Sequence, residues 1–236
     1  MNTETEFTYT GTSNLEVMQD ATKYNAWLVS LILRHVKSAP SKIMDIGAGI
    51  GLFADAVKKR GHSVVCVEPD VRQVILLQAK GFEVHKSPDT VPDKTFDLIY
   101  ALNVLEHIAD DRDALAQWSA KLKPGGYILI YVPAFRILFS SMDVKVGHFR
   151  RYRRKELSKK VLQAGLQPVG KVRYADCLGF FAAWLYKLTD KSGDVKRGGL
   201  IFYDRYCFPL SRICDRIFGL LFGKNVFVVA KKTDII

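Results

Sequence analysis

The sequence predicts an α/β fold, in which helices cover both faces of a mostly parallel β-sheet. Short apolar segments alternate with segments of helical spacing between residues 42 and 132, which is typical of strands joined by crossover helices. A glycine-rich turn, GAGIG, directly follows the first apolar segment. The chain has 236 residues, of which 48% are hydrophobic and 25% charged, an ordinary composition for one globular domain. Ligands of such sheets bind beyond the carboxyl ends of the strands, so we expect the functional site there.

The expected elements follow one another along the chain. A helix over residues 15–36, with Trp27, Leu28, Leu31 and Ile32 on one side, precedes Pro40. Strands are expected at 42–46, 63–67, 82–85, 96–101 and 127–132, and helices at 52–60, 71–79, 104–107 and 111–122. After Pro133 come a long loop, a basic helix, a further strand, two apolar helical segments at 177–188 and 209–222, and a last strand. We expect a single domain with a helical cap (1–40), a core (41–176), a helical insertion (177–222) and the last strand (223–236).

The net charge of +11 favours partners that carry negative charge, namely nucleic acid, an anionic membrane surface or a phosphorylated substrate. The four cysteines form no CxxC pair and no metal-ligand spacing, so we expect reduced thiols and no metal site. The first residues, MNTETEFTYTGTS, have no basic n-region and no apolar h-region, and no stretch reaches the roughly 18 apolar residues that span a bilayer. We therefore expect a cytoplasmic protein.

Glycines 47, 49 and 51 follow a strand and open a helix, where a tight turn exposes backbone N–H groups to a ligand. The dinucleotide fingerprint requires glycine at position 52, which is leucine here, so an NAD-dependent oxidoreductase is disfavoured. Glu68 ends the second strand about 20 residues after the first glycine, where a carboxylate can accept both ribose hydroxyls. The alternative is a turn that serves close packing, with a surface glutamate.

Four segments resemble the class I S-adenosylmethionine-dependent methyltransferases. MDIGAGIG is similar to that family's first motif, VVCVEPD to the acidic end of its second strand, FDLIYALNVLEHI to its fourth strand and the following turn, and LKPGGYILIYVP to its fifth strand. The resemblance implies a Rossmann-like, seven-stranded sheet with an antiparallel last strand, and S-adenosylmethionine (SAM) as the cofactor bound by the core at 41–176. The residues it places at the cofactor are Asp45, Gly47, Ala48, Gly49, Gly51, Glu68, Pro69, Asp89 and Asn103.

The chemistry of SAM agrees with these residues. SAM is a sulfonium cation with an amino group and a neutral adenosine, so it favours carboxylates such as Asp45 and Glu68 over the cationic partners of a diphosphate. Methyl transfer requires an in-line approach of the nucleophile to the methyl carbon, and positioning alone can lower the barrier by several kcal/mol. We therefore expect alignment of the two reactants to be the main catalytic task.

The turn after the fourth strand holds Asn103, Glu106 and His107. Methyltransferases that act on exocyclic amines of bases carry an Asn/Asp-Pro-Pro-aromatic signature at this point, and NVLE stands there instead, which disfavours nucleic acid as the acceptor. His107 is a candidate general base for a hydroxyl nucleophile, since an imidazole titrates near working pH. Equally, His107 could cap or pack its helix.

A basic segment, GHFRRYRRKEL, follows the fifth strand on the rim where this fold receives its acceptor. Arginine binds phosphate or carboxylate through two parallel N–H bonds, so we expect Arg150 and Arg151, with Tyr152, to hold an anionic acceptor, and His148 to be a second candidate base. The stretch resembles a methyltransferase subgroup with a GHxRRY sequence that is often associated with polysaccharide or lipid-linked glycan assembly. Two alternatives stay open: Arg153, Arg154 and Lys155 as a solvated helix start, and arginines and aromatics that stack on RNA bases.

The two apolar segments of the insertion also allow two interpretations. In the second segment, 209–222, one helical face carries Leu210, Ile213, Ile217 and Leu220. The plain interpretation is two helices that pack over the sheet or in an oligomer contact. The other is an in-plane helix pair at the inner face of the membrane, whose basic residues meet anionic lipid with about 1 kcal/mol each. These basic residues are Lys187, Lys191, Lys196, Arg197, Arg205, Arg212 and Arg216.

The sequence as a whole favours a SAM-dependent methyltransferase that acts on an oxygen, or as second choice a nitrogen, of an anionic or lipid-linked small molecule such as a sugar. A non-catalytic RNA- or membrane-binding module on the same fold is the alternative. The residues do not specify the oligomeric state.

Overall fold

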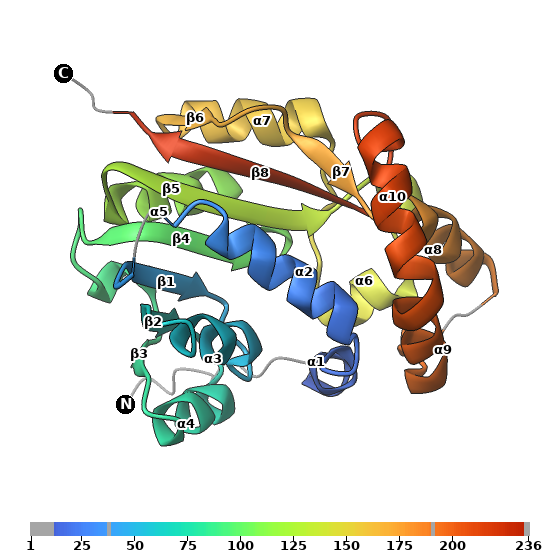
Figure 1. Ribbon diagram of the computed structural model, residues 1–236, viewed down its shortest axis with the longest axis horizontal. Coiled ribbons are helices and arrows are strands. Elements are labelled where there is room, and N and C mark those ends of the chain that lie inside the picture. The colour runs from blue at the N-terminus through green and yellow to red at the C-terminus, as the bar shows by residue number, and fades with distance from the viewer. Residues whose placement is uncertain (1–11, 37–38, 190–191, 234–236) are drawn as a thin grey trace.

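The computed structural model describes residues 12–36, 39–189 and 192–233, which form one mixed β-sheet with helices on both faces (Figure 1). Its strand order is β3-β2-β1-β4-β5-β8-β6, with β7 also paired to β8. Strands β1 to β5 are mutually parallel, and β8 runs antiparallel to β5, β6 and β7. The strands are β1 Lys42–Ile46, β2 Ser63–Val67, β3 Glu83–His85, β4 Phe96–Leu102, β5 Leu122–Pro133, β6 Leu166–Pro168, β7 Arg173–Ala175 and β8 Asn225–Lys232.

The predicted fold class is confirmed, including the antiparallel last strand, and one strand differs. The sixth position of the sheet holds two short strands, because the chain leaves the ladder after Val169, whose N–H still donates to the Val229 carbonyl of β8 at 2.8 Å, and returns to it at β7. Gly170, at φ 76°, takes the left-handed conformation in this break. Strands β6 and β7 therefore pair with different stretches of β8, one near each of its ends.

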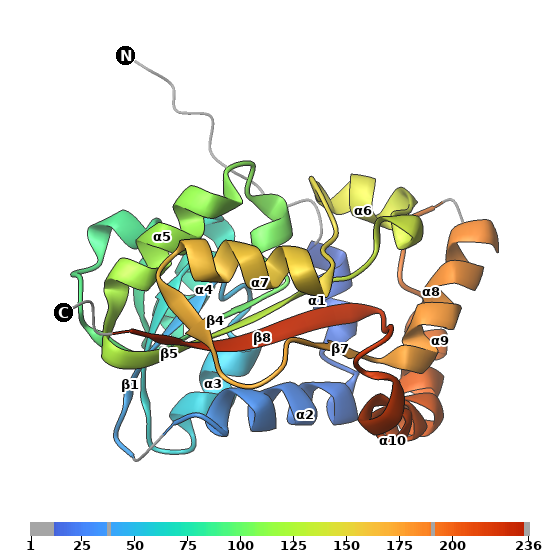
Figure 2. The same cartoon turned by 90° about the horizontal axis from the view of Figure 1, so that it is seen from above.

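Two helical layers cover the sheet (Figure 2). Helices α2 Thr22–Leu33, α3 Leu52–Lys58 and α4 Val71–Ala79 lie on one face, and α5 Asp111–Lys121 and α7 Arg154–Gln163 lie on the other. A third group of helices lies at the carboxyl ends of β1, β4 and β5. These are α1 Thr12–Met18, α6 Ser141–Val146, α8 Cys177–Thr189, α9 Arg197–Phe202 and α10 Phe208–Phe218. Shorter turns are η1 Pro88–Thr90, η2 Leu105–His107 and η3 Arg136–Leu138, and η4 Tyr203–Cys207 is a π-helical turn.

The prediction of one continuous helix over residues 15–36 is wrong, because the chain forms two helices there, α1 and α2, with a turn between them. Ala21, which precedes α2, offers no side-chain cap. Asp204 of η4 supplies the cap instead, since its carboxylate accepts hydrogen bonds from the backbone N–H groups of Lys23 (2.9 Å) and Tyr24 (2.8 Å). A residue that is distant in sequence therefore fixes where α2 begins.

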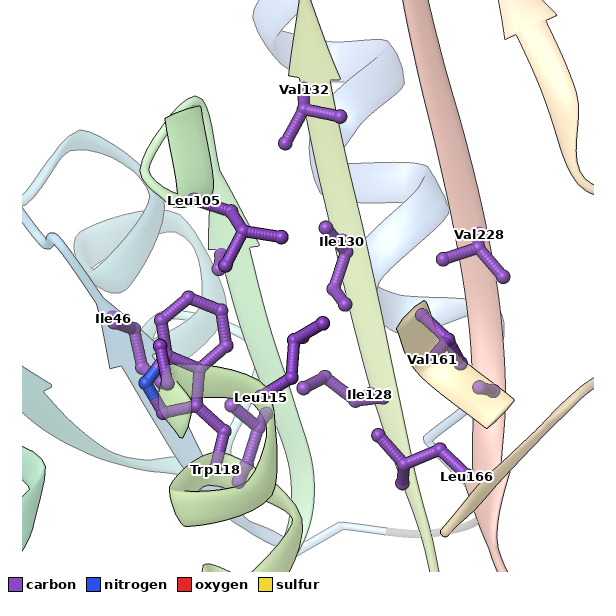
Figure 3. Packing of buried hydrophobic residues seen from close by; sticks show 14 of the residues in the cluster. Ile46, Leu105, Leu115, Trp118, Ile128, Ile130, Val132, Val161, Leu166 and Val228 are labelled. Atoms are coloured by element: carbon purple, nitrogen blue, oxygen red, sulfur yellow. The ribbon is translucent and has the colours of Figure 1, made fainter. Parts of the chain in front are cut away.

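The core has one apolar layer on each face of the sheet. Leu115 and Trp118 of α5 and Val161 of α7 pack on Ile128 and Ile130 of β5 (Figure 3). Each fully buried side chain of this size stabilises the fold by about 1.5–3 kcal/mol. Both faces of the parallel strands are covered, so the strands are almost entirely apolar, and a carboxylate within β1 is an exception that indicates function.

All four cysteines are free thiols, as expected, with Cys66 and Cys177 buried. Across the described ranges, none of the helices combines the length and the apolar character needed to cross a bilayer. Of the basic residues named above for the insertion, Lys191 lies outside the described residues.

Candidate functional site

The glycine turn between β1 and α3 has a backbone that only glycine adopts without strain. Gly47, Gly49 and Gly51 all have positive φ, at 69°, 57° and 81°. A Cβ on Gly47 would lie 2.5 Å from Cγ2 of Val104, and one on Gly51 would lie 2.8 Å from Cδ2 of Leu77. The turn is thus packed from behind by the loop after β4 and by α4, and the N–H groups of Gly47 and Ala48 donate to the Val67 carbonyl of β2 at 2.8 and 3.2 Å.

Two buried carboxylates flank this turn, as predicted. Asp45 is 3% exposed and accepts a hydrogen bond from the Tyr100 hydroxyl at 2.7 Å. Burial raises the pKa of Asp45 to about 7, against the lowering effect of the Tyr100 hydrogen bond. Glu68 accepts hydrogen bonds from the backbone N–H groups of Gly49 (2.8 Å) and Asp70 (3.0 Å). It therefore joins the end of β2 to the glycine turn, and burial raises its pKa as well.

A third polar group at the turn, Gln73, was missed by the sequence analysis. Its amide comes from α4, and an added Cβ on Gly49 would lie 3.3 Å from its Oε1. Both polar atoms of this amide are buried without a hydrogen-bond partner in the described part of the chain. An unpaired buried polar group costs about 1–3 kcal/mol, so the amide indicates that a polar ligand belongs beside it. The available signal was a glutamine on the apolar side of an amphipathic helix.

The turn region fits SAM through its two carboxylates and the unsatisfied Gln73 amide. The turn N–H groups that the sequence analysis expected to face a ligand donate within the protein instead, from Gly47, Ala48, Gly49 and Gly51. Ala48 is buried in the turn, whereas Pro69, Asp89 and Asn103 are exposed at its rim. Asp89 takes a hydrogen bond from the Ser87 hydroxyl (2.9 Å) within η1. Asn103 has φ 54°, and its N–H donates to the Tyr131 carbonyl at 2.7 Å. Their predicted contacts with the cofactor stay predictions.

The turn after β4 brings both candidate histidines together. The His107 and His148 rings lie with centroids 4.5 Å apart, although 41 positions separate them. The loop of His148 is held here because the Phe149 N–H donates to the Glu106 carbonyl at 2.8 Å. Glu106 is fully buried, and neither of its carboxylate oxygens has a hydrogen-bond partner among the described residues. Ligand atoms of these two histidines and Glu106 lie within 4.8 Å of one another, a spacing that could also hold a metal ion.

The two histidines have different surroundings. Nδ1 of His148 lies 2.7 Å from Oδ1 of Asp143, and its Nε2 lies 3.7 Å from Oε1 of Glu106. Burial raises the pKa of Glu106 to about 8. Burial, and then the neighbouring His148, lower the pKa of His107 to about 4. His107 also interacts with backbone carbonyls of α6 and the glycine after it, which agrees with the packing interpretation for that residue.

Arg151 and Tyr152 are buried, and their polar groups bind carboxylates of the protein; their predicted contact with an acceptor stays a prediction. The Arg151 guanidinium binds Asp143 through Nε (2.8 Å) and a terminal nitrogen (2.9 Å), and its side chain is 4% exposed. The Tyr152 hydroxyl donates to Asp111 at 2.8 Å, and its side chain is fully buried. Both side chains point into the protein, because each binds a buried carboxylate on a neighbouring element.

Arg150 also binds a carboxylate of the protein, but it is less buried than Arg151 and Tyr152. It pairs with Asp111 at 2.9 Å and donates to the Ala109 carbonyl, but 29% of its side chain stays exposed. It borders a surface cavity of about 380 Å³. The cavity is lined by Arg136, Phe139, Phe149, Arg150, Arg151, Arg153 and Glu156. Among these, Arg136 was missed, because it stands in an apolar stretch of the sequence.

This strand order, with a glycine turn after β1 and carboxylates near the ends of β1 and β2, defines the fold of class I SAM-dependent methyltransferases. Residues 19–170 match the family model described as a methyltransferase domain, and the chain belongs to this family. The GHxRRY subgroup is not identified by that match.

Individual relatives are more distant. The chain is 34% identical over 93 residues to a ubiquinone biosynthesis O-methyltransferase of Nitrobacter winogradskyi, in a match that spans 36% of each chain. A similar enzyme of Azotobacter vinelandii is 30% identical over 117 residues, 44% of this chain and 49% of its own. The chain thus spans less than half of the length of these curated relatives. A SAM-dependent methyltransferase of Archaeoglobus fulgidus has the same fold, with a TM-score of 0.62 at 20% identity over 92% of this chain and 98% of its own.

Proposed function

We propose that this chain transfers a methyl group from SAM to a hydroxyl oxygen of a small anionic molecule, and that His148 accepts the proton. The observation that carries the proposal is the His148–Asp143 pair, with 2.7 Å between Nδ1 and Oδ1, in a chain of the methyltransferase family. A hydroxyl is a poor nucleophile until it loses its proton, so a positioned base beside the donor site favours O-methylation.

The donor side needs groups that bind a cation and its polar ends. When bound, SAM supplies an electrophilic methyl group on a positively charged sulfur. Asp45 and Glu68 offer negative charge or acceptor oxygens, and the Gln73 amide gains the partner that it otherwise lacks. The Tyr100 hydroxyl favours the ionised form of Asp45, which is the form that attracts a cation.

The proton of the acceptor would pass to Nε2 of His148. The short contact with the Asp143 carboxylate assigns the ring proton to Nδ1, which leaves a lone pair on Nε2. Burial opposes the ionisation of Asp143, but hydrogen bonds from His148 and Arg151 hold its pKa below the usual value. Asp143 therefore stays charged and stabilises the imidazolium that forms, while Arg151 acts as a positioning residue. Glu106, with a pKa of about 8, is mostly protonated at neutral pH and does not compete for the proton.

The choice of acceptor has two supports. The relatives that match by sequence are named as O-methyltransferases of ubiquinone biosynthesis. The arginine-lined cavity beside Arg150 offers guanidinium groups to an anionic substituent. A nitrogen acceptor and a sugar acceptor are less well supported, since no residue on the described rim specifies either one.

Calorimetry tests the donor half of the proposal. The wild-type protein should bind SAM and not NAD, and Asp45→Ala or Gly49→Trp should abolish SAM binding. Asp55→Ala, which changes an exposed α3 carboxylate paired with Lys80, is the matched control and should bind normally. Binding of RNA or vesicles by a protein with no affinity for SAM would instead support the non-catalytic alternative.

Turnover tests the base. S-adenosylhomocysteine formation should be measured with a panel of phenolic and sugar acceptors that carry a carboxylate or phosphate. With an active acceptor, His148→Ala and Asp143→Asn should lower kcat about 10²-fold or more at neutral pH with SAM affinity retained. His107→Asn should have a much smaller effect. A loss that is equal in the two histidine variants would rule out the assignment of His148.

A further inference from the structure

Helix α10 has its polar side inward and its apolar side outward. Ser211 and Asp215 are buried at 0% and 4% exposure. Leu210, Ile213 and Ile217 are 57%, 58% and 71% exposed. A helix that packs on a soluble core normally shows the reverse pattern, because apolar side chains gain free energy when they leave water.

The inward polar side of α10 is fully committed to hydrogen bonds, so the helix is fixed in this orientation. The Asp215 carboxylate accepts from the backbone N–H groups of Asp176 (3.0 Å) and Cys177 (2.9 Å), where α8 begins. The Ser211 hydroxyl donates to Asp176 at 2.8 Å and accepts from the Leu178 N–H at 3.0 Å. Rotation of α10 would break these four bonds and leave buried polar groups without partners.

Helix α8 and the α9–η4 segment lie at the same end of the molecule as α10 (Figures 1 and 2), and they carry further exposed apolar side chains. On α8, Phe181, Trp184, Leu185 and Leu188 have helical spacing and are 48–63% exposed. More than half of the large apolar side chains that are exposed in the described residues lie within 177–222. We call these side chains the apolar end surface: Phe181, Trp184, Leu185, Leu188, Ile201, Phe202, Tyr206, Leu210, Ile213 and Ile217.

We propose that the apolar end surface docks on an anionic membrane surface. Lys187, Arg205 and Arg216 are exposed on the same helices. Among the acidic residues that the structure describes between 177 and 222, Asp204 caps α2, Asp215 holds α8, and Asp194 pairs with Lys145. The surface therefore combines apolar side chains with positive charge, which complements anionic headgroups.

A second copy of the chain is a poorer partner for this surface. Two copies face to face would bring their exposed arginines and lysines together, in a chain that already carries +11. Trp184 and Tyr206 have the amphipathic rings that favour the headgroup level of a bilayer. The surface also lies at the carboxyl-end edge of the sheet, where the glycine turn lies, so docking would bring the site to the bilayer.

Vesicle flotation tests the docking without any acceptor. Wild-type protein should float with vesicles of phosphatidylcholine and phosphatidylglycerol, and should not float with phosphatidylcholine alone. The double variant Ile213→Glu/Ile217→Glu should reduce recovery at least about tenfold. Ile75→Glu/Leu76→Glu, which changes exposed apolar residues of α4, is the matched control and should float like the wild type.

Two further measurements do not disturb packing. Arg205→Gln/Arg216→Gln should weaken binding to anionic vesicles, about fivefold for each charge, and added salt should have a similar effect. Brominated lipid should quench tryptophan emission of the wild type, and Trp184→Phe should remove most of the quenching. SAM binding by the variants checks that the site is intact, so failure of docking and failure of the proposed function are distinguishable.

Three results would overturn the proposal: no flotation of the wild type with anionic vesicles, equal loss in the α4 control, or a wild-type dimer that Ile213→Glu/Ile217→Glu dissociates. The last result would assign the surface to a second copy of the chain.

Discussion

The glycine turn and the arginine loop, residues 148–154, use their charged side chains in opposite ways. Around the turn, Asp45 and Glu68 are buried at the ends of apolar strands, and neither forms an ion pair with a basic side chain among the described residues. In the loop, the buried carboxylates of Asp111 and Asp143 bind Arg150 and Arg151, the two cations that the sequence analysis assigned to a ligand. The comparison shows that a run of charges predicts a partner only where the fold supplies no counter-charge of its own.

Asp111 is one of the buried carboxylates that bind cations of the arginine loop. Its carboxylate receives Lys160 at 2.8 Å, Arg150 at 2.9 Å and the Tyr152 hydroxyl at 2.8 Å. Burial opposes its ionisation, but these three donors hold the pKa of Asp111 below its usual value. Much of the basic character of the loop is thus used to fasten α5, α7 and the loop together.

The largest expected effect comes from Arg151→Ala. This change leaves the fully buried Asp143 without its bidentate partner, and loss of one member of a buried pair costs about 3–5 kcal/mol. Arg153→Ala, at an exposed position of the same loop, should change the free energy of unfolding by less than about 0.5 kcal/mol. Chemical denaturation measures both variants. Similar losses at the two positions would mean that burial does not distinguish the arginines of this loop.

Glu106→Gln should give a gain in stability that depends on pH. The folded protein raises the pKa of Glu106 from its ordinary value near 4.5 to about 8, so the folded state keeps a proton that the unfolded chain releases. Wild-type stability should therefore fall as pH rises from about 4.5 through 8, and the glutamine variant avoids this loss. We expect the difference in the free energy of unfolding, measured by chemical denaturation, to be small at about pH 4.5 and to favour the variant, by a few kcal/mol at most, at about pH 9. A difference that is independent of pH would show that Glu106 is not a buried acid with a raised pKa.

Tyr100→Phe sharpens the description of the turn. The Tyr100 hydroxyl lowers the pKa of Asp45, which burial has raised to about 7. Without the hydroxyl the carboxylate should hold its proton to higher pH, by about one unit, and SAM affinity at pH 7 should fall about fivefold, because the ionised fraction of Asp45 falls by that factor. Calorimetry at several pH values should show affinity recovering in alkaline solution. If affinity is unchanged at every pH, ionisation of Asp45 has no part in donor binding.

Gln73→Leu should have the smallest effect, and it should raise the stability of the free protein while it weakens SAM binding. The buried amide has no partner in the described structure, so an apolar side chain of similar size should stabilise the free protein by about 1 kcal/mol. The same change should weaken SAM binding, because the ligand then lacks a polar contact. Gln78→Leu, on the same helix at an exposed position, is the control for helix propensity. A loss of stability without SAM would contradict the assignment of Gln73 to the ligand.

Local patterns in the sequence were sufficient for the parallel half of the sheet. The predicted bounds of β1, β2 and α4 coincide with the observed ones, because apolar strands of a doubly covered sheet and the polar turns between them have strong signals. The glycine turn with Asp45 and Glu68 was predicted for the same reason, since each feature depends on neighbours in sequence. The sequence analysis placed His107 and His148 separately near this edge of the sheet, and the contact between their rings is a finding of the structure.

Features that depend on distant residues could not be predicted in this way. The break before α2 depends on Asp204, the inward course of Arg151 depends on Asp143, and the orientation of α10 depends on the start of α8. Helical spacing put Leu210, Ile213 and Ile217 of α10 on one face, but spacing alone does not say whether a face lies against the core or in water.

The capping of α2 by Asp204 has a consequence for synthesis of the chain. The cap joins positions that 180 residues separate, so α2 cannot be completed while the ribosome is still making the first half of the protein. Until η4 emerges, Trp27 and Leu28 lack part of their final surroundings, which include Phe208 and Tyr131. A chain truncated before residue 204 should accordingly expose its first helices to chaperones and proteases, even though every strand of the parallel half is already present.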